Sequence, residues 1–478
     1  MTPVYDVAVI GGGPAGLAAA TLAARYALAT VLFDEQAGPG GQSYGPPAVT
    51  PKSWPEARAG GDGDVTLIDA FRQSGATPVF DATVWSARKR DDGLYEIGVA
   101  YGAPDARSVR VACARAMIIA TGALARPFPI QGGTLLGVLG AADAQRMLTT
   151  PVIERTRRVV LAGNGPILWR LASECLDAGV ALEALLVTTP RTQRWRARTK
   201  AWNFALSSNF LRGLALERNV RRRVRVIANV TAIVASGPGR VETLQFETAR
   251  GTHMLQVDLL LLNQGMVPDI NLGSALGCAH RWNDAQACFE PIVDAWGGST
   301  LPGVFFAGDA AGIAGADAAP PRGHLAALAV ANALGRIDAK ARDAAAEKPR
   351  VSLRRALRGR PFLDALHRPA DGYRIPRGDT IVCRCENVTA EQVIAALRQG
   401  AIGPNQVKAL TRCGMGLCQG RFCGLTVTEL VARERGISPG EAGYFRLRWP
   451  VKPITLAELA AMPSSPEAER AVARGAPH

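Results

Sequence analysis

Histidine is scarce in this chain, and its scarcity excludes several kinds of chemistry. Only five histidines occur among 478 residues, and none of them forms a pair with the spacing of metal ligands. No Ser/His/Asp arrangement stands out, so hydrolysis by a nucleophilic triad has no support. No residue set suited to oxidising a substrate is evident either. The catalytic residues, if this chain holds any, are therefore unknown from its sequence.

Long apolar runs are absent as well. No run of apolar residues free of glycine, proline and charge approaches the length that crosses a bilayer. The first residues also lack the basic start of a signal peptide, because Asp6 stands there and a strand is expected from about Val4. We therefore expect a cytoplasmic protein, which a complex with other subunits could bring to the inner face of the membrane.

Lysine is the third scarce residue, with seven Lys beside 48 Arg and a formal net charge of +14. Residues 190–225 hold 11 of these basic residues and one acid. No aromatic stacking pattern or nucleic-acid motif accompanies them, so we expect no nucleic-acid partner. A solvated surface is the simpler interpretation of this stretch, and a docking face for an acidic partner subunit is the functional alternative.

A glycine loop near the N-terminus predicts a dinucleotide-binding domain. A strand over 4–10 precedes G-G-G-P-A-G, and an alanine-rich helix and a strand over 30–33 that ends at an acid follow. The glycines permit a tight turn, close approach of a diphosphate and helix–strand packing, while the acid suits a ribose. The candidate cofactor-binding residues of this unit are Gly11, Gly13, Pro14, Ala15, Gly16, Asp34 and Glu35.

Two later segments favour FAD over a bare nicotinamide cofactor. A-M-I-I-A-T-G over 116–122 ends in Thr121 and Gly122, and L-P-G-V-F-F-A-G-D-A-A-G over 301–312 contains Gly308 and Asp309. An aspartate in the second position can meet the ribityl chain and diphosphate of FAD. The order of these motifs resembles the two-dinucleotide-domain flavoproteins of the glutathione-reductase type, over residues 1–340. Gly41 and Gln42 complete the candidate cofactor residues.

A second nucleotide-type unit departs from the pattern. After a strand over 158–162, G-N-G-P-I-L places Leu168 where the third glycine belongs, and the strand over 184–189 ends without an acid. Leucine crowds the helix–strand contact and no carboxylate remains for a ribose diol, although Arg191 and Arg194 would suit a 2′-phosphate. We favour a structural relic or another ligand over a working NAD(P)H site.

Disulfide reduction is also excluded on sequence grounds. Enzymes of that kind need a redox-active cysteine pair near the flavin, and the segment G-P-G-G-Q-S-Y-G over 38–45 has no cysteine. The second unit carries no C-x-x-C motif. Four cysteines are scattered singly and are expected to be core thiols of a reducing compartment: Cys113, Cys175, Cys278 and Cys288.

The other five cysteines gather between residues 383 and 423. They stand as C-R-C and, further on, C-G-M-G-L-C-Q-G-R-F-C. Four thiolates without histidine suit a 2Fe–2S cluster or a zinc ion. We expect the ligands to be Cys383, Cys385, Cys413 and Cys418, with Cys423 as a spare. A helix expected from about 418 to 436 would place Cys418 in its first turn, where the helix dipole favours a negative cluster.

Three segments together are similar to a known family. They are D-E-Q-A-G-P-G-G-Q-S-Y (34–44), A-H-R-W-N-D-A-Q-A-C-F (279–289) and the cysteine segment over 383–423. They resemble the alpha (A) subunits of heteromeric flavin amine dehydrogenases. Relatives include subunits of opine oxidases, D-hydroxyproline dehydrogenases and hydrogen cyanide synthase, and the alpha subunit of sarcosine oxidase. The C-terminal part resembles bacterioferritin-associated ferredoxin, a four-cysteine 2Fe–2S module, and this favours iron–sulfur over zinc.

The resemblance implies an electron-transfer subunit that works with other chains. An FAD-containing beta subunit would oxidise a secondary amine or amino acid, and electrons would leave through the cluster to a quinone or cytochrome. Some relatives hold FMN at the interface with the beta subunit, and some add a small ferredoxin-like gamma subunit. The family's alpha site is not uniform, since some members hold NAD or an adenine nucleotide there. The sequence leaves two rivals open: a stand-alone NAD(P)H:acceptor reductase and a non-catalytic assembly subunit.

The expected fold is α/β, with a glutathione-reductase-like pair of dinucleotide domains and a small helical bacterioferritin-associated-ferredoxin-like 2Fe–2S domain at the C-terminus. T-A-E-Q over 389–392 predicts a capped helix in that small domain, and a second helix is expected from about residue 405. A helix over 353–366 is expected before it, and the tail should pack back onto the other domains. The expected limits are 1–125 and 280–345 for the FAD-binding domain, 150–279 for the second nucleotide-binding-like domain, 346–378 for a linker, 379–436 for the 2Fe–2S domain and 437–478 for the tail.

Overall fold

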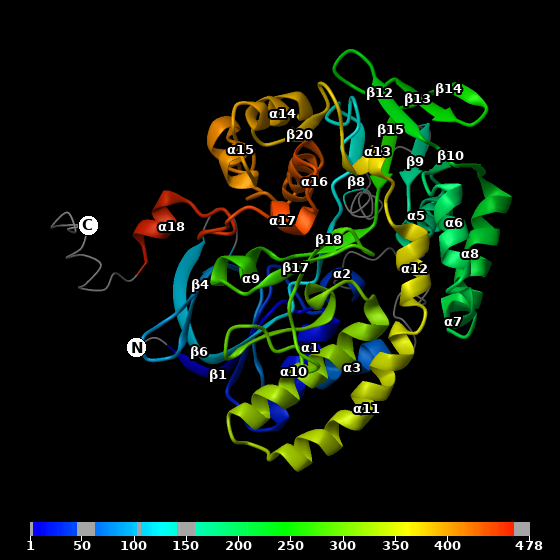
Figure 1. Cartoon of the computed structure of the whole chain (residues 1–478). Helices are drawn as coiled ribbons and strands as arrows, with labels where there is room; N and C mark the ends of the chain where they lie inside the picture. Colours follow the sequence, from blue (N-terminus) through cyan, green and yellow to red (C-terminus); the bar gives the residue numbers. More distant parts are fainter. Residues whose placement is uncertain are drawn as a thin grey trace.

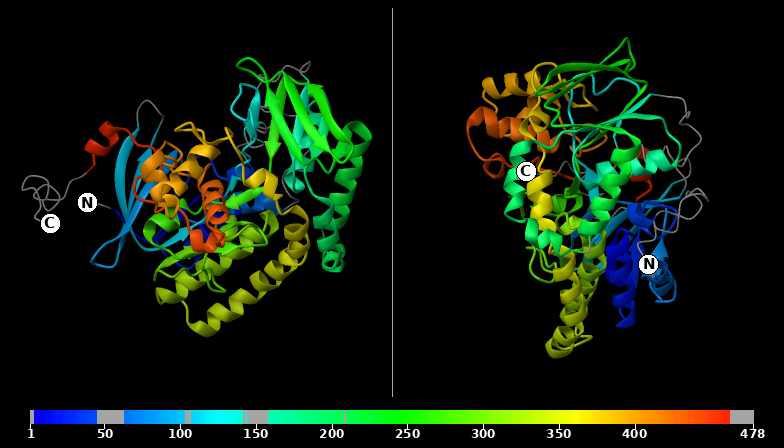
Figure 2. Two further views of the ribbon diagram at one scale, coloured as in Figure 1. Left: turned by 45° about the horizontal axis from the view of Figure 1, so that its top comes forward. Right: turned by 90° about the vertical axis from the view of Figure 1, so that its right-hand side faces the viewer.

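The computed structural model describes residues 3–44, 63–102, 107–140, 143, 158–207 and 209–462. The described chain forms two nucleotide-type units, each built on its own parallel sheet, and a small helical domain that lies against both (Figure 1). In the left-hand view of Figure 2 the helices of the second unit and the first sheet lie on opposite sides of the molecule. No helix in these ranges is both long and apolar enough to cross a membrane.

The first unit is built on a seven-stranded sheet, in which six strands follow the order β3-β2-β1-β6-β5-β4 and β19 also pairs with β6. The central strand β1 pairs in parallel with both β2 and β6, whereas β5 runs antiparallel to its two neighbours, β4 and β6. The predicted strands over 4–10 and 30–33 are confirmed. The strands are β1 (Val4–Ile10), β2 (Thr30–Phe33), β3 (Thr77–Val79), β4 (Ala82–Lys89), β5 (Tyr95–Tyr101), β6 (Ser108–Ile119) and β19 (Val304–Phe306).

Both faces of this sheet are buried, as expected for parallel strands covered on two sides. Successive side chains of β1 point to opposite faces, so Val7 and Val9 belong to one apolar cluster and Ala8 and Ile10 to another. The first cluster includes Leu17 of the helix that follows the glycine loop. That helix is α1 (Pro14–Arg25), and it packs against α10 (Ala319–Ala333) and α3 (Gly63–Arg72).

The second unit has a five-stranded parallel sheet of order β11-β10-β9-β15-β8. Leu168 is fully buried beneath it, in a cluster with Leu161 and Leu185. The leucine side chain therefore fills the space between helix and sheet, whereas a glycine would let the helix lie closer to the sheet. The elements are β8 (Val138–Gly140), β9 (Val159–Gly163), α5 (Pro166–Asp177), β10 (Leu182–Val187), α6 (Arg191–Arg198), α7 (Ala201–Ala205), α8 (Asn209–Arg223), β11 (Arg225–Ala228) and β15 (Leu259–Asn263).

A three-stranded antiparallel sheet covers the second unit: β12 (Ala232–Ser236), β13 (Thr243–Thr248) and β14 (Gly251–Gln256). The basic stretch predicted over 190–225 forms α6, α7 and α8, and it carries large apolar side chains that a purely solvated face does not need. Trp195, Trp202 and Leu211 are exposed there. Short pairs complete the sheets: β7 (Ala123–Ala125) with β16 (Met266–Pro268), and β17 (His280–Asn283) with β18 (Cys288–Pro291).

The segment between α10 and the cysteines is helical, but not as one helix over 353–366. The first helix ends at Leu357, and the next begins after Gly359 with Pro361 in its first turn, where the missing N–H costs nothing. The three helices are α11 (Ala339–Leu357), α12 (Arg360–His367) and α13 (Asp371–Arg374). Arg374 is buried and forms an ion pair with buried Glu429 of the small domain, which fixes the two parts together.

The small domain packs four helices and a short hairpin around buried sulfur atoms. Thr389 caps the first helix in a capping box with Gln392, as predicted, and the second predicted helix begins at Pro404. Val393, Val407 and Val427 share its core with three of the cysteines. The elements are β20 (Ile381–Cys383), β21 (Val388–Thr389), α14 (Ala390–Arg398), α15 (Pro404–Thr411), α16 (Gly424–Arg435) and α17 (Pro439–Ala442).

The predicted helix start near Cys418 is wrong, because α16 begins at Gly424. The preceding residues 412–423, the cluster loop, are wound in turns. Arg412, Gly414, Gln419 and Gly420 all have positive φ, which a right-handed helix does not allow. The helix N-terminus therefore faces Cys423, its N-cap residue, rather than Cys418.

The tail packs back onto the first unit, as predicted. The N–H of Val451 donates to the carbonyl oxygen of Trp85 in β4 at 2.9 Å. Lys452 Nζ donates to the Glu35 carboxylate at 2.6 Å. The last described helix, α18 (Leu456–Ala460), lies beside β4 and β6 in both figures.

Candidate cofactor sites

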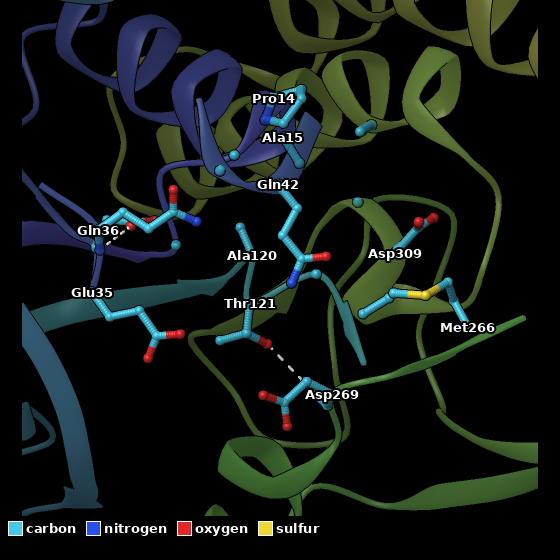
Figure 3. A pocket seen from close by; sticks show the side chains of 18 of the residues that line it. Pro14, Ala15, Glu35, Gln36, Gln42, Ala120, Thr121, Met266, Asp269 and Asp309 are labelled. Atoms are coloured by element: carbon cyan, nitrogen blue, oxygen red, sulfur yellow. Dashed lines mark hydrogen bonds between the residues drawn. The ribbon is translucent and has the colours of Figure 1, made fainter. Parts of the chain in front are cut away.

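A cavity of about 410 Å³ lies where the first sheet, the second unit, the cluster loop and the tail meet. Its volume falls within the range usual for small-molecule and cofactor sites. Figure 3 shows Pro14 and Ala15 on one side, Asp269 on the other, and Glu35 and Asp309 at two ends. Every predicted cofactor residue except Gly16 lines it: Gly11, Gly13, Pro14, Ala15, Asp34, Glu35, Gly41, Gln42, Thr121, Gly122, Gly308 and Asp309.

The glycine loop leaves the room that a diphosphate needs. A Cβ built on Gly13 would have no protein atom within 4 Å, so the space before it is open. Gly13 is also the N-cap of α1, and no side chain caps this helix. The first N–H groups of α1 are therefore unsatisfied donors at the positive end of the helix dipole, an arrangement that binds phosphate.

Gly16 lies beneath the cavity and serves the packing of α1. A Cβ on Gly16 would come within 1.8 Å of the Gly11 carbonyl oxygen. This oxygen belongs to the backbone and cannot move aside as a flexible side chain could. The helix could not then lie so close to β1. This is the packing role that the third glycine of the motif suggests.

Asp34 holds the glycine loop in shape. Its carboxylate accepts the N–H groups of Gly12 and Gln36, and the second of these bonds measures 2.7 Å. Burial raises the pKa of Asp34, while the two backbone N–H donors oppose that shift. Glu35 is exposed at the cavity edge and pairs with Lys452. Both acids stand at the end of β2, where the motif places the ribose contact.

The opposite end of the cavity is held by Asp309 and Arg322. Asp309 Oδ1 accepts the N–H groups of Ala314 and Gly315 at 2.8 and 3.0 Å. Arg322 donates to the carbonyl oxygens of Gly308 and Gly312. The arginine thus fixes the turn that presents Asp309 to the cavity.

Several lining residues carry no recognisable motif and were missed from the sequence. Asn263 ends β15, Met266 and Asp269 follow it, and Arg421 and Lys452 come from the cluster loop and the tail. Arg421 lies close to the Asp269 carboxylate, with 3.7 Å between its Nε and Oδ1. Only the position of Arg421 between two cysteines signalled a role, since its neighbours in space are remote in sequence.

Three buried sulfur atoms meet in the small domain. The Sγ atoms of Cys383, Cys413 and Cys423 lie within 4.8 Å of one another. Hydrogen bonds from Cys413 and Cys423, and then from the N–H groups of Gly414 and Glu386, lower the pKa of Cys383 to about 2. The bond to Cys383 raises the pKa of Cys413 and of Cys423. One thiolate is therefore already stabilised among them, and soft metal ions favour such ligands.

Cys385 and Cys418 form a second pair at the surface side of this group. Cys385 is exposed, and Cys418 is half-buried and hydrogen-bonded to it. A Cβ on Gly416 would come within 2.2 Å of the Cys385 Cβ, so only glycine lets the loop close over that residue. N–H groups of Phe422 and Gly420 also point at Cys418. The structure thus places the four predicted ligands in two pairs, Cys385 with Cys418 and Cys383 with Cys413, and adds Cys423 to the second pair.

The second glycine loop is partly covered by the chain itself, at Asn164. Asn164 is buried and donates through Nδ2 to the carbonyl oxygen of His367, at the end of α12, at 2.9 Å. Its Oδ1 lies 2.9 Å from His367 Nδ1 and accepts the Thr189 hydroxyl at 2.6 Å. Desolvation and nearby arginines lower the pKa of His367 to about 3, so its ring is neutral at pH 7. The side chain of Asn164 is thus paired with protein and unavailable to a nucleotide, although no side chain caps α5 and a Cβ on Gly165 would meet no protein atom within 4 Å.

Comparison with protein families gives two matches along the chain. Residues 5–333 match the pyridine nucleotide-disulphide oxidoreductase model, and residues 381–433 match the BFD-like 2Fe-2S binding domain. The first match implies FAD. The second match decides between an iron–sulfur cluster and zinc in favour of a 2Fe–2S cluster. All nine cysteines are free, and none lines the described cavity, so the first match brings no disulfide-reducing pair with it.

Curated relatives cover nearly the whole chain. The opine oxidase A subunit of Rhizobium meliloti is 40% identical over 473 residues, which are 98% of this chain and 89% of the relative. The opine oxidase A subunit of Agrobacterium tumefaciens is 40% identical over 99% of this chain and 94% of its own. The HcnB subunit of hydrogen cyanide synthase from Pseudomonas aeruginosa is 28% identical over 93% and 96% of the two chains.

A solved structure supports the fold. L-proline dehydrogenase from P. horikoshii superposes with a TM-score of 0.69 at 20% identity, covering 96% of this chain and 80% of that one. At this identity the similarity speaks for the fold alone. The glutathione-reductase-like α/β architecture with its C-terminal 2Fe–2S domain, and the resemblance to the amine dehydrogenase subunits, are both confirmed by the matches taken together.

Proposed function

This chain belongs to the family of the opine oxidase A subunits, within the pyridine nucleotide-disulphide oxidoreductases, and on that premise we propose that it is the electron-transfer subunit of a heteromeric dehydrogenase. The substrate of the complex is a secondary amine or an amino acid, such as an opine or D-hydroxyproline. Its oxidation takes place on a partner beta subunit that holds its own FAD.

One observation carries this proposal: the cluster loop and the dinucleotide loop border the same cavity. Arg421, between Cys418 and Cys423, lines the space that Gly13 and Asp309 also line. Flavin accepts an electron pair and can release it one electron at a time, which a 2Fe–2S centre can carry. This chain would hold both cofactors side by side, and its sequence shows no evident base for a substrate. Both features suit a subunit that relays electrons.

The chain's own residues hold and shield the dinucleotide. The N–H groups at the start of α1 bind the diphosphate, Asp34 keeps the glycine loop in its open form, and Asp309 faces the ribityl end. Val451 and Lys452 of the tail close the edge next to Glu35. The predicted domain limits, including the FAD-binding parts over 1–125 and 280–345, are retained as part of this proposal.

The cluster takes two of its ligands from the outer pair, Cys385 and Cys418, and two from the inner three sulfur atoms. Cys383 and Cys413 are the sequence-based choice for the inner pair. Cys423 competes with Cys413, because it is buried beside Cys383 and caps α16, whose N-terminus stabilises a thiolate. Only one of Cys413 and Cys423 is then needed.

Single substitutions to serine separate these choices. We expect Cys383→Ser, Cys385→Ser and Cys418→Ser to lose the visible bands of the cluster and about two irons per chain. Of Cys413→Ser and Cys423→Ser, one loses the cluster and the other retains it. If both Cys413→Ser and Cys423→Ser retain their iron, the proposed centre is contradicted. One zinc and no iron in the wild-type chain would contradict it as well.

The partner assignment is tested by co-expression with a beta subunit. We expect amine oxidation by the complex and none by the isolated chain, with reduction of the cluster during turnover. Electrons then pass to a quinone or cytochrome, and an interfacial FMN and a small ferredoxin-like gamma subunit complete the proposed assembly. The proposed location is cytoplasmic, at the inner face of the membrane where a quinone is the acceptor. Full activity of the isolated chain would overturn the relay.

The NAD(P)H reductase alternative is disfavoured by the covered second loop. Buried Leu168 occupies the helix–sheet contact, and Asn164 is paired with His367 and Thr189. We expect no bleaching of the bound flavin when NADH or NADPH is added without oxygen. The assembly-subunit alternative predicts instead a cluster that stays oxidised during turnover of the complex, which freeze-quench electron paramagnetic resonance would detect.

A further inference from the structure

Arg421 lies between the two cofactor sites and contacts residues of both. Its side chain is 10% exposed, and the neighbouring Asp269 side chain is 9% exposed. One guanidinium nitrogen, Nη1, donates to the carbonyl oxygen of Cys418 at 3.3 Å and to that of Val451 at 2.7 Å. The residue therefore links the cluster loop to the tail segment that lines the cavity.

Asp269 links Arg421 to the opposite wall of the cavity. Its carboxylate accepts the N–H of Asn271, and its carbonyl oxygen accepts the Thr121 hydroxyl at 3.4 Å. Asn271 donates in turn to the carbonyl oxygen of Gln419 in the cluster loop at 3.0 Å. Two separate contacts thus join the cluster loop to the wall that contains Thr121.

The guanidinium retains an unused donor. Arg421 Nε is buried and has no hydrogen-bond acceptor among the described residues, since Asp269 Oδ1 lies 3.7 Å away. A buried donor without an acceptor costs free energy, and the planar guanidinium matches phosphate oxygens closely. Nε itself is shielded from the cavity, so the donor that can reach a nucleotide is Nη2, which makes no hydrogen bond to the described residues while Nη1 is engaged by Cys418 and Val451.

We propose that Arg421 couples the two sites: it binds a phosphate oxygen of the nucleotide in the cavity while it holds the cluster loop, so nucleotide binding and cluster retention reinforce each other. The iron-bound cysteines order the cluster loop and so place the guanidinium. By linkage, a nucleotide that holds the guanidinium must stabilise the cluster loop by the same factor. This inference rests on the proposed two-cofactor function and adds a thermodynamic link to it.

The first measurement is the affinity of the full-length, cluster-loaded chain for FAD and for ADP, by titration after removal of the nucleotide. We expect Arg421→Gln to bind both about tenfold more weakly, within the range usual for coupled sites. Arg421→Lys should recover part of the loss, because it keeps the charge without the fork of donors. An unchanged affinity, or a loss for FAD but not for ADP, would overturn the phosphate contact.

Arg412→Gln is the matched control. Arg412 also lies in the cluster loop, but it is 69% exposed, pairs with Glu386 at 3.0 Å and does not line the cavity. We expect its nucleotide affinities to stay within about twofold of wild type, as for most exposed ion pairs. A loss equal to that of Arg421→Gln would mean that any change in the loop weakens the cavity, and would contradict a specific role.

The second measurement is cluster loss to an iron chelator, followed by the visible bands with and without saturating FAD. In the wild type we expect FAD to slow the loss about tenfold. In Arg421→Gln that protection should disappear, whereas a merely structural role would speed the loss equally with and without FAD. Equal protection in both proteins overturns the inference. Failure to load iron at all would overturn the proposed function with it, while loaded cofactors without coupling would overturn the inference alone.

Discussion

The two glycine loops of this protein begin alike and end differently. Both follow a buried parallel strand and open a helix whose first turn contains proline. Before Gly13 lies an open cavity, whereas Asn164 of the second loop is engaged by His367 and Thr189. Neither helix has a side-chain cap, so the contrast lies in the residue before the last glycine of each loop: Gly12 has no side chain, whereas the Asn164 side chain is bonded to α12 and Thr189. The difference teaches that the same motif can serve a ligand or a contact between distant parts of the chain.

The comparison is tested most strongly at the open loop. Gly13→Val places a branched side chain in free space before the helix, so the protein should fold but the cofactor should be crowded out. Overpacking of this kind costs about 1–3 kcal/mol, which lowers the affinity for FAD about 5- to 150-fold in a fluorescence titration. Gly38→Val is the control, because its added Cβ is also free of contacts and the residue does not line the cavity. Equal losses in both variants would contradict the assignment.

The second loop should respond in stability rather than in cofactor binding. Asn164→Ala leaves the Thr189 hydroxyl and His367 without their partners, and each buried unsatisfied group costs about 1–3 kcal/mol. We expect about 2 kcal/mol less free energy of unfolding in urea, with unchanged FAD affinity. Asn203→Ala on the exposed face of α7 should change the stability by less than about 0.5 kcal/mol. A loss of FAD from Asn164→Ala would erase the contrast between the loops.

A pH dependence follows from the neutral His367. Its pKa is about 3 in the fold, from desolvation and then the nearby arginines, against about 6.5 in an unfolded chain. Between these values only the unfolded state binds the proton, so stability falls as the pH drops below 6.5, by at most about 1.4 kcal/mol per pH unit. His367→Gln should show a shallower loss between pH 6.5 and 4. Parallel curves for both proteins would show that this histidine is not kept neutral.

The smallest effect is expected at the cavity edge. Lys452 and Glu35 form an ion pair at 2.6 Å, with side chains 29% and 57% exposed. Exposed pairs contribute about 0–1 kcal/mol, so Lys452→Met should weaken FAD binding by less than about fivefold at low salt and less still at high salt. A salt-independent loss as large as that of Gly13→Val would mean that the tail, rather than the glycine loop, dominates the open site.

Local patterns in the sequence predicted much of the fold. The strand limits of β1 and β2 followed from apolar runs beside a glycine loop, and the Thr389 capping box marked α14. The cavity-lining residues that belong to motifs could be named in advance, from Gly11 to Asp309. Leu168 could be recognised as a departure because the motif specifies a small residue at its position.

The amino-acid sequence alone determined the two nucleotide-type units and the cysteine-rich domain, because each of these depends on residues close together along the chain. Only the tertiary structure decided that His367, some 200 residues away, covers the second loop, and that Arg421 reaches the first cavity. It also brought Cys423 to Cys383 and moved the start of α16 past the cluster loop. These contacts depend on how the domains pack, and no spacing along the chain encodes a distance across such an interface.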